Sequence, residues 1–133
     1  MIKININSLE GEFCIEIKEN EDQYDLIVMM SKSDYFQENG KVWYGKTTEK
    51  QRVIAILNLI KACEENPSFP TTITINDGII TKISYGKPLN NLVLKDIDAR
   101  TIEFELMKKV FELVKELIKD PILEKYMLVF RNE

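Results

Sequence analysis

Every second residue is apolar in two short stretches near the start of the chain, residues 2–6 and residues 13–17. This period of two is typical of strands that bury one face. Between them, Gly11 supplies a residue that tolerates a positive φ in a short hairpin loop. Folding there pairs Ile6 with Phe13, Ile4 with Ile15, and Ile2 with Ile17. Because a slip by one residue would break all three apolar pairs, the alternation predicts a hairpin in this register.

A third strand extends this hairpin by the same criterion. With residues 19–22 as the loop, Ile17 faces Tyr24, Ile15 faces Leu26, and Phe13 faces Val28. The pattern therefore predicts a three-stranded antiparallel meander with one apolar face. Its reverse face carries Lys3, Asn5, Glu12, Cys14, Glu16, Lys18, Asp25, Ile27 and Met29. We expect this reverse face to be acidic, with Ile27 and Met29 marking partial cover or a contact patch.

The connection after the third strand brings aromatic residues close to carboxylates. Asn39-Gly40 is a turn signal, and residues 42–44 predict a fourth strand. The aromatic residues of this stretch are Tyr35, Phe36, Trp43 and Tyr44. Aromatics in such a setting resemble an interface hot spot, or they cap the edge of the core. The second interpretation is favoured, because large aromatic side chains are usually mostly buried.

A helix and a second hairpin are predicted next. A capping-box pattern at Thr48 and Gln51, followed by apolar residues at helical spacing, predicts a helix that ends near Asn66. Residues 71–85 then predict a hairpin. A three-residue turn at 76–78, with Gly78 left-handed, is the choice that sets all its apolar residues on one face.

A long final helix is predicted from a cap at Asp98 or Thr101 to about Lys119. Its apolar stripe comprises Phe104, Met107, Val110, Phe111, Val114, Leu117 and Ile118. Asp120-Pro121 then predicts a cap followed by proline at a first helical position. Residues 92–97 and 126–130 stay open between helix and strand.

These elements predict one fold class for the whole chain. It is an α+β fold, in which an antiparallel β-meander of about four strands is packed on one face by helices. The element order is ββββ-α-ββ-α, with an uncertain C-terminal helix or strand. The chain has 133 residues, a length that favours a single domain over residues 1–133.

Composition excludes several kinds of chemistry. The chain has no histidine, so it lacks the commonest general base and metal ligand. The two cysteines, Cys14 and Cys63, form no metal-binding or redox pair, and we expect them to be small buried residues. We therefore expect no catalytic residues, no cofactor and no metal. No segment resembles a secretory signal or approaches the ~18 apolar residues that cross a bilayer, so a cytoplasmic protein without membrane contact is expected.

One stretch, Gly40–Thr47, matches the phosphate-loop pattern G-x-x-x-x-G-K-[ST]. That motif works when a flexible loop lets backbone N–H groups surround the phosphates. Here residues 41–44 are bulky and predict a strand, so we expect a strand that runs into a helix cap. A nucleotide-binding enzyme acting through Gly40–Thr47 is the weakest alternative. Nucleic-acid binding is disfavoured by the isoelectric point of about 5.0.

Negative charge is concentrated in the first forty residues. Up to Gly40, nine carboxylates accompany three lysines, whereas from Lys41 onward thirteen accompany fifteen basic residues. An acidic surface speeds association with a basic partner. We therefore expect a small acidic protein-binding module, most of all an immunity-type inhibitor that neutralises a basic protein such as a nuclease toxin. The expected partner-binding residues are Glu10, Glu12, Glu16, Glu19, Glu21, Asp22, Asp25, Asp34, Tyr35, Phe36 and Glu38.

Two other interpretations of the acidic segment stay open. The carboxylates can simply keep a sheet edge soluble. The chain can also be a structural or adaptor subunit without catalytic activity, including a homodimer that uses Ile27, Met29 and the exposed sheet face.

Overall fold

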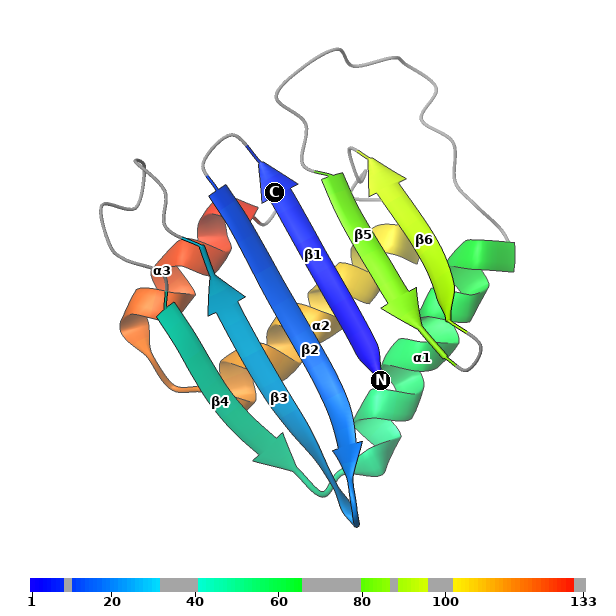
Figure 1. Ribbon diagram of the computed structural model, residues 1–133, viewed down its shortest axis with the longest axis horizontal. Helices are drawn as coiled ribbons and strands as arrows, with labels where there is room; N and C mark the ends of the chain where they lie inside the picture. The colour runs from blue at the N-terminus through cyan, green and yellow to red at the C-terminus, as the bar shows by residue number, and fades with distance from the viewer. Residues whose placement is uncertain (9–10, 32–40, 66–79, 87–88, 96–101, 131–133) are drawn as a thin grey trace.

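The computed structural model describes residues 1–8, 11–31, 41–65, 80–86, 89–95 and 102–130. Its elements are β1 (Ile2–Ser8), β2 (Gly11–Asn20), β3 (Gln23–Met30), β4 (Lys41–Thr47), α1 (Lys50–Glu65), β5 (Ile80–Tyr85), β6 (Asn90–Lys95), α2 (Ile102–Leu117) and α3 (Pro121–Phe130). The strands form one antiparallel six-stranded sheet in the order β4-β3-β2-β1-β5-β6. The helices lie on one side of this sheet (Figure 1). This is the predicted α+β fold, with β1–β4 as the meander.

The pairing of β1 with β2 is the predicted one, with Ile4 opposite Ile15. The predicted register of β2 with β3 is wrong by two residues, because Ile15 faces Val28 instead of Leu26. The turn between these strands consists of residues 21–22 alone, not of residues 19–22. Since a shift by two residues leaves every side chain on its own face, the predicted apolar face is preserved.

The backbone of the short turn has an unusual conformation at its first residue. Glu21 has a φ of 56°. Two-residue hairpin turns need a positive φ at the first central position, where glycine or asparagine is the usual choice. The sequence prediction missed this turn because glutamate carries no such preference.

The strands that follow α1 join the same sheet. β5 pairs with β1 along one edge and with β6 along the other. Of the hairpin predicted for residues 71–85, the first strand and the turn lie outside the described residues, and Ile83 and Tyr85 of the second strand are buried as predicted. The segment 92–97, open between helix and strand, belongs as far as Lys95 to β6.

The two long helices bury one face each against the sheet. At the start of α1, Thr47 Oγ1 accepts a hydrogen bond from Glu49 N at 3.0 Å, one residue before the predicted cap at Thr48. α2 ends two residues before the predicted Lys119. Leu106 and Leu113 are buried in addition to the predicted stripe, whereas Phe104 and Leu117 are only half-buried.

The C-terminal element is a helix. Residues 126–130, open between helix and strand, continue the helix α3 that begins at Pro121. Asp120 caps it as predicted, because its Oδ1 accepts a hydrogen bond from Ile122 N at 2.9 Å. Its Oδ2 accepts a second one, from Trp43 Nε1 at 2.8 Å. Trp43 is 9% exposed, so it caps the edge of the core, as the favoured interpretation expected.

The edge strand β4 lies very close to the end of α2 at Gly45. A Cβ atom at this position would lie 3.2 Å from both Leu117 Cβ and Ile118 Cγ1. Such contacts are tighter than ordinary packing, so a side chain here would push strand and helix apart. Gly45 therefore sets the spacing between β4 and α2.

Candidate functional site

The face of the sheet opposite the helices has no described element over it (Figure 1). Residues directly opposite each other on paired strands share a face, so the register identifies the residues of this face. Among the side chains that the structure describes, it comprises Val42, Tyr44 and Lys46 of β4; Gln23, Asp25, Ile27 and Met29 of β3; Glu12, Cys14, Glu16, Lys18 and Asn20 of β2; Lys3, Asn5 and Asn7 of β1; Ile80, Lys82 and Ser84 of β5; and Asn91 and Val93 of β6. We call this surface the open face.

An apolar block occupies the β3–β4 end of the open face. Val42 pairs with Met29, and Tyr44 pairs with Ile27. Val42 is 48% exposed and Tyr44 is 72% exposed. Isolated apolar side chains are common on protein surfaces, but an adjoining group of them usually marks a contact surface. We call these four residues the apolar block; they extend the patch that the sequence predicted at Ile27 and Met29.

The charges of the open face are nearly balanced, which corrects the expectation of an acidic face. β4 and β5 contribute Lys46 and Lys82, so the face carries the lysines Lys3, Lys18, Lys46 and Lys82 and the carboxylates Glu12, Glu16 and Asp25. Asp25 lies between Lys18 and Lys46 in the register. Its carboxylate also accepts hydrogen bonds from Asn20 Nδ2 at 3.0 Å and from Gln23 Nε2 at 3.1 Å. Asp25 is therefore hydrogen-bonded within the chain and lies between two lysines in the register.

The negative charge is instead concentrated at the β2–β3 turn, which lies at one extreme of the sheet (Figure 1). Glu19, Glu21 and Asp22 are all exposed there. None of them takes part in an ion pair within the described part of the chain. A small hollow of about 200 Å³, lined in part by Asp22 and Thr48, lies beside the turn. We call these three carboxylates the acidic tip.

The structure brings together only some of the predicted partner-binding residues. Glu19, Glu21 and Asp22 form the acidic tip, whereas Glu12 lies near the opposite end of β2, roughly 23 Å from Glu19 at the usual rise per strand residue. Glu16 lies between them and is paired with Lys18 at 3.7 Å. Asp25 lies on the open face opposite Lys18, and the other predicted residues, Glu10, Asp34, Tyr35, Phe36 and Glu38, lie outside the described residues.

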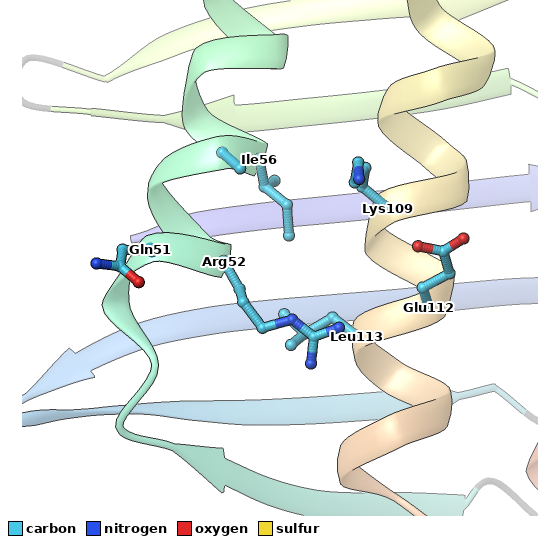
Figure 2. Close-up of a pocket in the computed structure, with 7 residues that line it drawn as sticks. Gln51, Arg52, Ile56, Lys109, Glu112 and Leu113 are labelled. Atoms are coloured by element: carbon cyan, nitrogen blue, oxygen red, sulfur yellow. The ribbon is translucent and has the colours of Figure 1, made fainter.

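Two further hollows carry mixed side chains. One, of about 460 Å³, lies on the open face beside Cys14, Met29 and Val42. The other is a groove of about 220 Å³ between α1 and α2, lined in part by Arg52 and Leu113 (Figure 2). Arg52 forms ion pairs with Glu116 and, at 3.8 Å, with Glu49. Because two carboxylates already compensate Arg52, this groove offers little net charge to an anion.

The described residues give no support for nucleophilic, metal or phosphate chemistry. Burial raises the pKa of both thiols, Cys14 and Cys63, to about 11, which leaves little thiolate at neutral pH. Within the described ranges, no group of three potential metal ligands occurs, and no helix is long and apolar enough to cross a membrane. Lys41–Thr47 is the extended strand β4, paired with β3, and not a phosphate-binding loop.

Sequence reasoning missed Val42 and Tyr44 as surface residues because it treated the aromatics around Trp43 as one group. The alternation on β4 was a usable signal, since residues 42 and 44 must face away from a buried Trp43. Comparison of the chain with protein-family models, with curated proteins and with solved structures found no significant match.

Proposed function

We propose that the chain is a small protein-binding module that recognises a basic partner protein with its acidic tip. The observation that carries this proposal is the gathering of Glu19, Glu21 and Asp22 on one two-residue turn and the strand end beside it. Because these carboxylates have no cationic partner in the described part of the chain, their field is directed at solvent. A basic surface would meet this field before contact.

An immunity-type inhibitor is the form of this function that the shape favours most. A nuclease binds its substrate's phosphates in a basic cleft. A hairpin turn at the extreme of the molecule can enter such a cleft, and its carboxylates would occupy the positions of phosphates. The partner would be a basic protein such as a nuclease toxin, and the chain itself would supply no catalytic group.

The test is affinity capture from a lysate of the cells that produce the protein, followed by mass spectrometry and titration of the purified partner. The variant replaces the tip through Glu19→Lys, Glu21→Lys and Asp22→Lys, which changes the formal net charge from −4 to +2. We expect a basic protein to be retained by the wild type and lost from this variant. The association rate constant of the variant should be at least about tenfold lower than that of the wild type, and this difference should shrink as salt screens the charges.

A matched control separates the tip from net charge alone. Glu64→Lys, Glu65→Lys and Glu112→Lys change exposed carboxylates on the helices and give the same net charge of +2. This variant should keep most of the binding. Equal loss in both variants, or retention of no basic protein by the wild type, would contradict the proposal.

A further inference from the structure

The open face is a large surface with an apolar block at one end. At the usual strand spacing and rise, six strands of about seven residues give a face of roughly 650 Å², close to the ~800 Å² that each partner buries in a standard interface. Its described charges nearly cancel. A surface of this size, with balanced charge and exposed apolar side chains, suits a partner of similar character. We propose that a second copy of this chain covers it, and that the two sheets pack face to face.

A two-fold axis gives this packing a definite arrangement. Neighbouring strands place Val42, Met29 and Cys14 in one row and Tyr44, Ile27 and Glu16 in the next. We place the two-fold axis parallel to the sheet, across the strands and midway between these two rows. The first row of one copy then faces the second row of the other copy. Val42 then meets Tyr44 of the second copy, and Met29 meets Ile27 of the second copy. The apolar blocks of the two copies cover each other.

The same axis places charged residues of the open face opposite residues of opposite charge or no charge. Along β2, it lays Lys18 on Glu12 of the second copy, and this contact occurs twice. It lays Glu16 on Cys14 and Lys3 on Asn5, so these charges meet uncharged side chains. Among the described residues, no two like charges face each other directly. In aligned sheet packing, the strands of the two sheets cross at roughly 30°. Lys and Glu side chains are long enough to keep their charged ends in contact at this crossing angle.

The shape of the surface fits this arrangement independently of its charge. Tyr44 projects from β4 and is the most exposed of the large apolar side chains. The hollow of about 460 Å³ beside Val42 lies on the same face. Since the axis lays Tyr44 of one copy on Val42 of the other, a projecting ring meets a depression. Aromatic side chains seated in pockets supply much of the energy of stable interfaces.

A charge-exchange experiment tests the arrangement. Sedimentation velocity from micromolar to submillimolar concentration should show the wild type shifting towards twice the monomer mass. Lys18→Glu and Glu12→Lys should each raise the dimer dissociation constant about tenfold or more, because each sets two like-charge pairs in the interface. The double variant Lys18→Glu/Glu12→Lys should return to within about threefold of the wild type, because it restores both pairs in reverse.

Two controls complete the design. Lys61→Glu, Glu64→Lys and their double variant change exposed charges on α1 and should leave dimerisation unchanged. Tyr44→Ala should weaken the dimer, with the far-ultraviolet circular dichroism of the monomer unchanged, because this side chain is 72% exposed. The acidic tip lies outside the rows that pack together, so the tip variant should dimerise normally. Failure of tip binding and failure of dimerisation are therefore separate results.

Three outcomes would overturn the inference. The wild type can remain monomeric at every concentration, or the dimer can persist in Lys18→Glu and Tyr44→Ala. The double charge exchange can also fail to restore what the single changes remove. If the wild type is monomeric and a basic partner protects the β3 and β4 amides from hydrogen exchange, the open face belongs to that partner and not to a second copy.

Discussion

One carboxylate, Asp120, links the C-terminal helix to the edge of the sheet. The hydrogen bond from Trp43 Nε1 is the main reason why the pKa of Asp120 lies below its ordinary value of 3.8. Backbone hydrogen bonds from Ile122 and Leu123 and the positive charge of Lys41 lower this pKa further, whereas partial desolvation opposes the lowering. A carboxylate with a lowered pKa stabilises the fold above its ordinary pKa. This contribution disappears as the pH falls through the lowered value. The sequence predicted the cap at Asp120, but not its bond to a side chain 77 positions away.

Replacement of this carboxylate should therefore have a pH-dependent effect. Asp120→Asn should be less stable than the wild type at pH 7, and the two should converge as the pH falls well below 3.8, where the wild-type carboxyl is also neutral. Urea unfolding at a series of pH values measures the difference. Glu64→Gln, at an exposed position on α1, is the control and should follow the wild type throughout. A difference that stays constant down to the lowest pH would rule out the ionised carboxylate as its cause.

The register of β2 with β3 shows that an apolar pattern specifies which face a side chain occupies, but not which residue it pairs with. Alternation excludes any odd shift of β3 against β2, but shifts by two residues satisfy it equally well. The sequence therefore predicted the correct face for Leu26 and Val28, together with partners displaced by two residues. The choice between the registers lies in the turn, where Glu21 adopts a positive φ. Glutamate gives no local signal for this conformation.

A glycine at the first turn position should stabilise the hairpin. Because a non-glycine residue in the left-handed region costs roughly 1–2 kcal/mol, Glu21→Gly should raise the free energy of unfolding by about 0.5–1 kcal/mol after its extra chain entropy is counted. Asp22→Gly is the matched control, because Asp22 has no positive φ, and it should lower stability slightly. Urea denaturation measures both. An equal loss of stability in the two variants would be incompatible with the two-residue turn.

At the scale of the whole molecule, the layer of helices divides the surface into a covered and an uncovered sheet face. The sequence predicted β1–β5, α1, α2 and the packing of helices on one face, because each depends on local periodicity, whereas it left most of β6 and the second half of α3 open between helix and strand. It did not predict the balance of charge on the open face. Lys46 and Lys82 come from strands distant in sequence, and only the order β4-β3-β2-β1-β5-β6 places them beside Asp25 and Asn5. The acidic tip, by contrast, is local, and the sequence found its residues.

The two thiols should distinguish these faces chemically. Cys14 is 8% exposed on the open face, whereas Cys63 is fully buried on the inward face of α1. Burial raises the pKa of both thiols from 9.0 to about 11, so native alkylation at pH 8 should be roughly a hundredfold slower than in the unfolded chain. Cys14 should react faster than Cys63, which needs the molecule to open. Iodoacetamide labelling followed by mass spectrometry measures both rates; equal native rates would show that α1 opens separately from the sheet.

The chain has a single tryptophan, and its position gives the molecule an optical reporter of its own. The Trp43 indole is nearly dry and donates to Asp120 at the point where α3 begins. Detachment of α3 would expose the indole ring to water and remove its hydrogen-bond acceptor at the same time. The wavelength of the Trp43 fluorescence maximum therefore reports whether the C-terminal helix is docked. The last helix can thus be watched in solution without any added label, while the rest of the fold remains spectroscopically silent at that wavelength.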